Sequence, residues 1–457
     1  MEHFASLSLE ELLRPEGFDC ECGRHHNSSR LRKVLIEENA INKIPKVLAE
    51  LSISHPFLLM DHNTKAAAGD MVCDVLVEEG IEYQALVLQG EQIEPDEHAV
   101  GTVVLALKPV CDGIVAIGSG VINDICKVVS RHAKCPQVTV ATAPSMDGYA
   151  STCASMLIGG LKTSIYLSSP NAVIADINVL KNAPMRMIQA GLGDMITKFV
   201  SLPEWKLANI VHQEYWCRET SELAKKGAEL CFQAAPFLAE RDPGAISLLI
   251  KGLILSGICM CMVNVSGPAS GGEHYVSHIW DMENIEKGHA LELHGIQTGI
   301  GTLYMMSVYE HMRDIVPNRE KATAFAQGFD RSRWEKDMRR LFGKGADQAI
   351  ANEMRAGKHN AQKHQEQFEV ILQHWPEIHD LINEIPDAKT AESIWALTGA
   401  PLSHREIGYS DARLLDAFTY SPEIRDRYIG VRLLWDIGML EEAKGWLLES
   451  DRKSTEK

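Results

Sequence analysis

Short apolar runs alternate with amphipathic segments through the first part of the chain. The runs Pro56–Met60 and Gly113–Ile117 are apolar at nearly every position, and helical spacing follows each of them. Gln137–Ala141 is a further predicted strand, and a polar loop follows it. Strands that are apolar on both faces are typical of a parallel sheet covered by helices on both sides. The pattern therefore predicts an α/β domain over residues 50–180, preceded by an N-terminal extension over residues 1–49.

The pattern changes near Pro184. Before it, Ser164–Leu167 and Ala172–Ile174 predict two more short strands, in a hairpin around Pro170. After it, apolar residues recur at helical spacing and no strand is expected. We therefore expect an all-α C-terminal domain over residues 181–457.

The charge balance narrows the classes of function. The formal net charge of -17 argues against a protein that binds nucleic acid. The charged stretch Arg313–His364 predicts helices with a solvated face.

No apolar run is expected to span a bilayer, and the N-terminus lacks the pattern of a signal peptide. The odd number of cysteines, 11, predicts reduced thiols and hence a cytoplasmic protein.

One cysteine cluster lies near the N-terminus. Cys20, Cys22, His25 and His26 stand in the run DCECGRHH. Such residues are metal ligands, but C-x-C-x-x-H is tighter than zinc-finger spacing and no second half follows nearby. A structural or surface role is the favoured interpretation, and a small metal site is the alternative.

A glycine-containing turn follows one of the predicted strands. Gly118, Ser119 and Gly120 stand between this strand and a predicted helix, where the helix N-terminus would bind a pyrophosphate. The full dinucleotide fingerprint has another glycine where this chain has Asn123, so a tight turn is the alternative. Asp61, which ends an earlier strand, predicts a bond to a ribose diol and a preference for NAD over NADP; a helix cap is its alternative.

A histidine-rich stretch supplies candidate metal ligands. His274 and His278 are four residues apart and share a helix face, and His294 follows. Asp194, which two glycines closely precede, is the candidate third ligand, although a helical ion pair with Lys198 is the alternative. Two imidazoles and a carboxylate suit Zn²⁺ or a related divalent ion with one position open for substrate.

Five motifs in order give the chain a family resemblance. They are GSGVINDICK (118–127), TAPSMDGYAS (142–151), GLGDMITK (191–198), GGEHYVSH (271–278) and LHGIQTGIG (293–301). The chain resembles the sn-glycerol-1-phosphate dehydrogenases, in particular their bacterial branch. That family is related to 3-dehydroquinate synthases, glycerol dehydrogenases and iron-type alcohol dehydrogenases. The resemblance implies a dehydroquinate synthase-like fold, with a dinucleotide-binding α/β domain, an all-α domain and an active site in the cleft between them.

The resemblance also implies roles for individual residues. The metal ligands would be Asp194, His274 and His294, and the metal zinc or nickel. The cofactor, NAD(P), would bind at Gly118, Ser119 and Gly120, with Thr142 and Ser145 along it. The residues expected near the substrate or the proton transfer are His278, Asp124, Asp147 and Ser151. His289 is left as a surface residue or one just behind the ligands.

One position departs from the family pattern. The family has an arginine shortly before the first histidine pair, and this chain has Gly267 there. If that arginine binds the substrate phosphate, Lys162 and Lys198 are the candidates to replace it, and Lys198 is also a candidate catalytic residue.

The resulting prediction is a metal-dependent enzyme that reversibly reduces dihydroxyacetone phosphate to sn-glycerol 1-phosphate with NAD(P)H. The metal would polarise the C2 oxygen while a nicotinamide delivers hydride. Another polyol or alcohol dehydrogenase and a dehydroquinate synthase-like lyase are the enzymatic alternatives. The lyase would need a more basic phosphate pocket. A catalytically dead nucleotide-binding scaffold is the third alternative. The apolar helical half predicts a homodimer.

Overall fold

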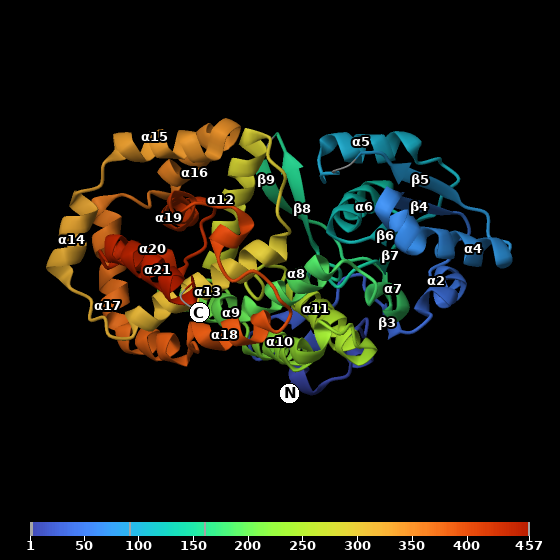
Figure 1. The fold of residues 1–457 in the computed structure, drawn as a ribbon, viewed down its shortest axis with the longest axis horizontal. Coiled ribbons are helices and arrows are strands. Elements are labelled where there is room, and N and C mark those ends of the chain that lie inside the picture. The colour runs from blue at the N-terminus through green and yellow to red at the C-terminus, as the bar shows by residue number, and fades with distance from the viewer. Residues whose placement is uncertain (1–2, 91–92, 160, 456–457) are drawn as a thin grey trace. The chain divides into compact units, whose positions relative to one another are not determined.

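The computed structural model describes residues 3–90, 93–159 and 161–455 (Figure 1). Among these residues the chain forms two compact units, each discontinuous in sequence. Unit 1 takes in Met1–Ile158, Lys162–Met195 and Cys217–Pro268, and unit 2 takes in Gly159–Leu161, Ile196–Trp216 and Ala269–Lys457. The sequence boundaries at 49/50 and 180/181 stay a prediction.

A six-stranded parallel sheet forms the centre of unit 1. Its strands are β3 (Lys33–Glu37), β4 (Pro56–Asp61), β5 (Gln84–Leu88), β6 (Gly113–Gly118), β7 (Gln137–Ala141) and β10 (Ala172–Asp176). Their order in the sheet is β3-β10-β7-β6-β4-β5. After β4 the chain continues to the outer strand β5, then returns to the other side of β4 as β6. The direction of winding therefore reverses between β4 and β6, which is where ligands bind in open α/β sheets.

The helices of unit 1 cover the sheet and extend beyond it (Figure 1). The main ones are α2 (Ile44–Glu50), α4 (Asp70–Glu78), α5 (Glu97–Ala106), α6 (Gly120–Ala133), α7 (Ile177–Leu180), α8 (Met185–Ile196), α10 (Arg218–Leu238) and α11 (Pro243–Val263). Alternate strand residues face opposite sides, so that Leu58 and Met60 pack with α2 and α4 while Phe57 and Leu59 pack with α5 and α6. Both faces are buried, as the continuous apolar runs predicted.

The predicted hairpin around Pro170 is wrong. β9 (Leu161–Tyr166) pairs with β8 (Cys153–Ile158), while β10 lies between β3 and β7 in the main sheet. β8 was missed because its sequence, CASMLI, mixes small and polar residues with apolar ones and follows no clear alternation.

The expectation that no apolar run could span a bilayer is also wrong on length and composition. α11 is 21 residues long, and the mean hydropathy of its most apolar window is 2.2. By its length and its composition alone, it could cross a membrane. However, 83% of that window is buried inside the protein. A helix that is apolar on all sides and covered by protein is a core helix, so its composition reflects burial in unit 1.

Unit 2 is helical. Its helices are α9 (Lys198–His212), α12 (Gly272–Lys287), α13 (His294–Met312), α14 (Arg319–Gln327), α15 (Arg331–Phe342), α16 (Ala346–Ala356), α17 (Ala361–Glu384), α18 (Ala388–Ala396), α19 (Asp411–Tyr420), α20 (Gly430–Asp436) and α21 (Leu440–Thr455). In the described part of the chain no strand follows β10, as predicted.

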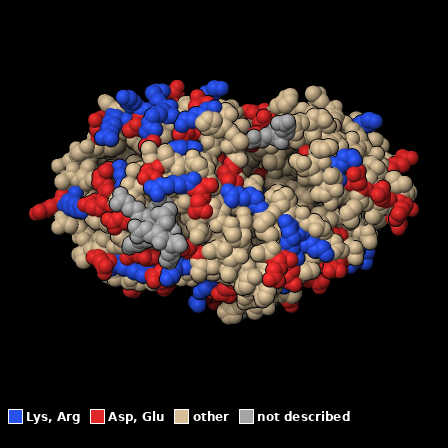
Figure 2. All heavy atoms as spheres, viewed as in Figure 1, with Lys and Arg blue, Asp and Glu red and all other residues tan. Residues whose placement is uncertain are grey.

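The charged stretch forms α14, α15, α16 and the start of α17. On α15 the buried residues Trp334, Met338 and Leu341 lie along one face of the helix. The face in Figure 2 has acidic and basic side chains interspersed, with basic ones gathered over α15. The stretch is therefore a set of packed helices with a solvated face, as the sequence predicted.

Candidate nucleotide pocket and metal ligands

A pocket of about 790 Å³ lies at the carboxyl ends of the central strands of unit 1. Its lining includes Asp61 at the end of β4, Ser119 after β6, Thr142 after β7 and Asn178 after β10. These positions flank the point where the winding of the sheet reverses, which is the usual ligand position in this architecture. Three predicted cofactor residues, Asp61, Ser119 and Thr142, thus lie around one cavity.

The N-terminus of α6 opens onto this pocket. Ser119 is the N-cap residue but makes no side-chain capping bond, and Val121 and Ile122 line the cavity. The first N–H groups of a helix lack partners within the helix and bind anions. A Cβ on Gly118 would come 2.6 Å from the Cβ of Ile122, so glycine is required there. A Cβ on Gly120 would meet only Met146, at 3.8 Å, so glycine there is not imposed by packing and leaves room for a ligand.

Asp61 fits both of its sequence interpretations. Its carboxylate accepts a hydrogen bond from the Thr64 backbone N–H at 2.8 Å, and its own N–H donates to the Thr64 hydroxyl at 2.9 Å. It therefore caps a short helix, α3 (His62–Thr64), and also lines the pocket.

Ser145 lies in the loop after β7 but not among the residues that line the pocket. It is buried and hydrogen-bonds the hydroxyl of Tyr149, which also contacts Ser119 and donates to the Ala143 carbonyl at 2.7 Å. Burial raises the pKa of Tyr149, and the bonds from Ser145 and Ser119 oppose that rise. Ser145 therefore supports the wall behind the α6 N-terminus.

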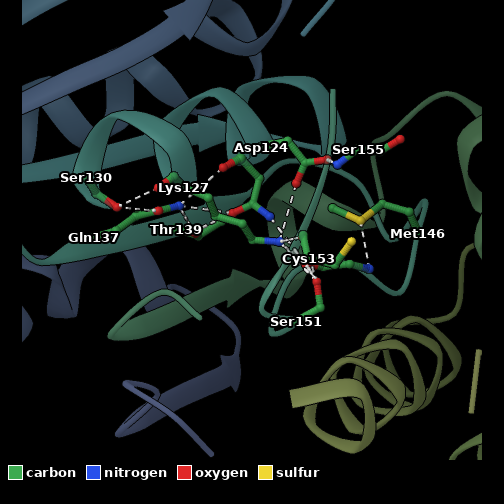
Figure 3. A network of polar contacts seen from close by, with 11 residues as sticks. Asp124, Lys127, Ser130, Gln137, Thr139, Met146, Ser151, Cys153 and Ser155 are labelled. Carbon is green, nitrogen blue, oxygen red and sulfur yellow. Dashed lines mark hydrogen bonds and ion pairs between the residues drawn. The ribbon is translucent and has the colours of Figure 1, made fainter. Parts of the chain in front are cut away.

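A buried lysine that the sequence reasoning missed organises the loop beside α6 (Figure 3). The Lys127 ammonium donates to the carbonyls of Gly148 and Cys153, both at 2.7 Å, and to the Ser151 hydroxyl at 3.1 Å. It also pairs with Asp124 at 3.3 Å. The available signal was its position on α6 among apolar residues. Ser151, a predicted substrate residue, already uses its hydroxyl in this network.

Asp124 lies where this network meets β8. Its carboxylate accepts from the backbone N–H of Ser155 at 2.9 Å and from Lys127. Burial raises the pKa of Asp124, while the positive charges of Lys127 and, more weakly, Lys162 lower it. The predicted residues Asp124 and Lys162 are therefore close enough to interact electrostatically.

Asp147 and Asp194 are in direct contact within unit 1. The backbone N–H of Asp147 donates to Asp194 Oδ2 at 3.1 Å, and the Asp147 carboxylate accepts from Ser256 at 2.7 Å. A Cβ on Gly191 would lie 1.8 Å from the carbonyl oxygen of Pro144. The sequence predicted a close approach at the glycines before Asp194, and Gly191 makes one with the backbone of Pro144. This contact packs α8 against the 144–147 loop.

Three histidines of unit 2 come together where α12 meets the start of α13. The ring centroids of His274 and His294 are 5.0 Å apart, and His278 stacks on His294 at 5.6 Å with an interplanar angle of 13°. Ligand atoms of His278, His294 and Asp281 all lie within 4.8 Å of one another. His289, by contrast, is exposed. The histidine cluster is therefore real, while the participation of Asp194 from unit 1 stays a prediction.

Glu273 and Glu204 form a buried acidic pair behind His274. Glu273 accepts a hydrogen bond from His274 Nδ1 at 2.7 Å, which leaves Nε2 as the ligand atom. Glu204 accepts from Tyr309 at 2.8 Å. Burial raises the pKa of Glu273 to about 7 and, together with the charge of Glu273, that of Glu204 to about 8. A Cβ on Gly271 would come within 2.8 Å of both carboxylates, so the glycine before the histidines makes room for them.

Two further cations lie near these residues of unit 2. Lys198 is buried, and its positive charge lowers the pKa of Glu273. The predicted continuous helix carrying Asp194 and Lys198 is wrong, because α8 ends at Ile196 and α9 begins at Lys198. Arg427, which the sequence reasoning missed, donates to the carbonyl of Ser270 at 2.9 Å. No spacing signal links two residues 157 positions apart.

Comparisons with known proteins agree with this arrangement. The family model for iron-containing alcohol dehydrogenases matches residues 35–184. The glycerol-1-phosphate dehydrogenase [NAD(P)+] of Pyrococcus furiosus is 35% identical over 305 residues, which cover 65% of this chain and 86% of that protein. The corresponding enzyme of Halalkalibacterium halodurans is 32% identical over 296 residues, covering 64% and 74%. That of Bacillus licheniformis is 26% identical over 425 residues, covering 92% and 93%.

Solved structures share the fold. The glycerol dehydrogenase of Schizosaccharomyces pombe matches with a TM-score of 0.62 at 13% identity, over 96% of this chain and 95% of that one. A probable glycerol dehydrogenase from Sinorhizobium meliloti gives 0.61 at 14% identity, over 92% and 98%. The expected dehydroquinate synthase-like architecture, with a parallel α/β part and a helical part, is confirmed. With the sequence relatives, these observations show that the chain belongs to the glycerol-1-phosphate dehydrogenase family.

Proposed function

We propose that this protein is a metal-dependent enzyme that reversibly reduces dihydroxyacetone phosphate to sn-glycerol 1-phosphate with NAD(P)H. The observation that carries the proposal is the pocket of unit 1, because it lies where a parallel sheet binds dinucleotides and opens onto an uncapped helix N-terminus. The proposed substrate is the one indicated by relatives such as the 35% identical glycerol-1-phosphate dehydrogenase of Pyrococcus furiosus.

The cofactor would bind along the strand ends of unit 1. The N–H groups at Gly118, Ser119 and Gly120 would hold the pyrophosphate, since anions bind at helix N-termini. Asp61 would accept hydrogen bonds from a ribose diol with the carboxylate oxygen that does not cap α3. Thr142 would lie along the cofactor, and Ser145 would act through Tyr149 and Ser119. The bound nicotinamide would supply hydride to C2.

The donor set suits a divalent metal ion. Asp194, His274 and His294 would hold it, and zinc or nickel accepts such ligands. The fit rests on His274, whose Nδ1 is fixed by Glu273, so that the neutral ring presents Nε2. A bound ion would supply Lewis acidity at the C2 oxygen.

The remaining polar residues would handle the proton and the phosphate. His278, stacked on His294, would give a proton to the developing C2 alkoxide, and Asp124 would belong to the same relay. Lys198 and Lys162 would bind the substrate phosphate, with Lys198 also close to the reaction as a catalytic residue. Asp147 would orient the substrate. Ser151 would shape the loop through Lys127 and contact the substrate only if that network rearranges.

An assay of NADH and NADPH oxidation with dihydroxyacetone phosphate tests the proposal, in protein freed of metal and then supplied with zinc, nickel or iron. Turnover that depends on added metal supports it, and no turnover under any of these conditions refutes it. Release of inorganic phosphate from a seven-carbon sugar-acid phosphate would favour a lyase instead.

Matched histidine variants test the metal site. His274→Ala should lose bound metal and at least about a hundredfold in kcat/KM, because a ligand is removed. His289→Ala, at an exposed position on the same stretch, should keep both. Equal activity and metal content in the two variants would show that the metal site is misassigned. An Asp194→Ala variant with full metal content and activity would remove that residue from the ligand set.

The proposal also covers the cellular location and the oligomeric state of the protein. We propose a cytoplasmic homodimer, from the reduced state of the cysteines and the apolar helical half. Light scattering at micromolar protein concentration measures the mass, and a monomer would contradict this part alone.

A further inference from the structure

A second cluster of metal-ligating side chains lies in unit 1. Cys20, Cys22, His26 and Cys217 each place one ligand atom within 4.8 Å of all the others. Cys20 and Cys22 lie in the loop of the hairpin formed by β1 (Phe18–Asp19) and β2 (His25–His26), and His26 is on the returning strand. Cys217 lies at the start of α10. It supplies the distant ligand that the sequence near Cys20 and Cys22 does not contain. We propose that these four residues form a structural zinc site.

The distances match a tetrahedral ion. For Zn–S near 2.3 Å and Zn–N near 2.0 Å, tetrahedral geometry places two sulfurs about 3.8 Å apart and a sulfur and a nitrogen about 3.5 Å apart. Cys20 Sγ and Cys217 Sγ are 3.7 Å apart, and Cys217 Sγ and His26 Nε2 are 3.5 Å apart. The Cys22 Sγ–His26 Nε2 distance is 3.1 Å, somewhat shorter. Three sulfurs and one nitrogen complete the shell, which is typical of a structural site rather than a catalytic one.

The surroundings of His26 present the correct nitrogen. Its Nδ1 donates to the backbone carbonyl of Met262 at 3.0 Å, and the ring is almost fully buried. Because Nδ1 carries the proton, Nε2 keeps its lone pair and points at the sulfurs. A Cβ on Gly17, where φ is +65°, would lie 2.3 Å from the His26 carbonyl oxygen, so glycine is needed for the chain to pass this strand.

Cys217 lies at the start of a long helix, where the helix N-terminus attracts negatively charged groups. It is the N-cap residue of α10, a helix of 21 residues, so it lies at the positive end of a helix dipole. The hydroxyl of Thr220 donates to Cys217 Sγ at 3.4 Å. His25, which the sequence pattern also offered as a ligand, is exposed and pairs with Asp19 at 2.8 Å.

The ion would join three segments far apart in sequence. These are the N-terminal hairpin, the start of α10 and, through His26, the end of α11. The segment before the hairpin already packs on this region, since the Phe4 N–H donates to Glu219 on α10 at 3.0 Å and the Phe4 ring contacts the His26 ring with centroids 5.7 Å apart. The site would therefore hold the N-terminal segment on the helical side of unit 1.

Zinc analysis of full-length protein after dialysis against a mild chelator tests the site. Cys217→Ser should lose one equivalent of zinc relative to wild type and lower the Tm by at least about 5 °C. Cys73→Ser, at a half-buried cysteine on α4, should match wild type. His26→Cys, which replaces one zinc ligand by another, should keep the zinc. Zinc content unchanged in Cys217→Ser and Cys22→Ser would refute the site.

Cobalt separates this site from the proposed catalytic one. Co²⁺ added to metal-free wild type, or to His274→Ala, should give a thiolate-to-cobalt charge-transfer band, because only the cysteine site has sulfur ligands. Cys217→Ser should give none, and the same band in Cys217→Ser would contradict the proposal. Titration of unfolded wild type without reductant should find all 11 thiols once zinc is removed. Two fewer thiols would indicate a disulfide and overturn it.

Discussion

Replacing Gly191 by alanine tests the packing that positions Asp194. The added Cβ would lie 1.8 Å from the carbonyl oxygen of Pro144 and 2.9 Å from its carbon. A non-bonded carbon and oxygen need about 3.3 Å. α8 and the loop after β7 must therefore separate by about 1.5 Å, because a backbone carbonyl cannot rotate away as a side chain can. That shift would break the bond from the Asp147 N–H to Asp194, now 3.1 Å long.

The expected cost combines three contributions. Overpacking a tight core costs about 1–3 kcal/mol, and a lost hydrogen bond about 1 kcal/mol. Alanine regains about 1 kcal/mol over glycine in a helix. With the first contribution at its upper end, the free energy of unfolding should fall by about 3 kcal/mol. The Tm should fall by about 3–6 °C, depending on how much of the chain unfolds together. A displacement above 1 Å near a reacting group should reduce kcat/KM by about a hundredfold.

Thermal unfolding and the activity assay measure the two effects. Gly101→Ala is the matched control, because Gly101 lies in α5 of the same unit and an added Cβ there meets nothing within 4 Å. That variant should be as stable as wild type or slightly more stable. If Gly191→Ala has the same Tm and activity as Gly101→Ala, α8 does not approach the Pro144 carbonyl as closely as the structure has it. A lowered Tm with no activity in wild type would instead uphold the packing and refute the proposed reaction.

Three further predictions concern the cofactor, the buried lysine and pH. Asp61→Asn keeps a capping oxygen but removes the negative charge that would disfavour NADP. Steady-state kinetics should therefore show about a tenfold lower KM for NADPH. An unchanged KM would show that Asp61 does not contact the ribose. Lys127→Met leaves buried carbonyls without their donor and should cost about 3 kcal/mol in urea unfolding, whereas exposed Lys46→Met should cost under about 0.5 kcal/mol. Similar costs would contradict the network. Burial raises the pKa values of Glu273 and Glu204 to about 7 and 8 from 4.5, so in folded metal-free protein each carboxyl holds a proton that the unfolded chain releases. Stability should therefore fall as pH rises from about 5 to 8, by at most about 2.7 kcal/mol per pH unit while both carboxyls hold their protons. Glu204→Gln should flatten this slope, and an unaltered slope would rule the pair out as its source.

Much of the nucleotide-binding half could be predicted because its signals are local. The runs at Pro56–Met60 and Gly113–Ile117 became neighbouring strands β4 and β6, and the turn at Gly118 became the start of α6 beside a pocket. Such positions depend on residues within a few places of one another, so periodicity and turn chemistry identify them. The helix cap and the pocket position of Asp61 are both present, so its two interpretations were never exclusive.

The rest depended on contacts that no spacing predicts. Cys217 reaches His26 across 191 residues, so the cluster at Cys20 looked like half a site. The interruption between α8 and α9 at Thr197 was invisible because helix-forming residues continue on both sides. Sequence also left Lys127 as an ordinary helix residue, although its burial makes it the centre of a polar network. Burial and long-range partners are properties of the tertiary structure, so the roles of these residues could not be predicted from the sequence alone.

The discontinuity of the two units has a consequence for synthesis. Apart from the short excursion at Gly159–Leu161, the chain leaves unit 1 after Met195, returns to it at Cys217 and leaves it again after Pro268. A nascent chain ending at Met195 would contain the whole parallel sheet but neither α10 nor the apolar α11. Unit 1 therefore cannot be completed on the ribosome until Pro268 has emerged, well past the middle of the chain. During that interval the surface that α10 and α11 will bury is exposed, so the protein should depend on chaperones that hold unfinished chains.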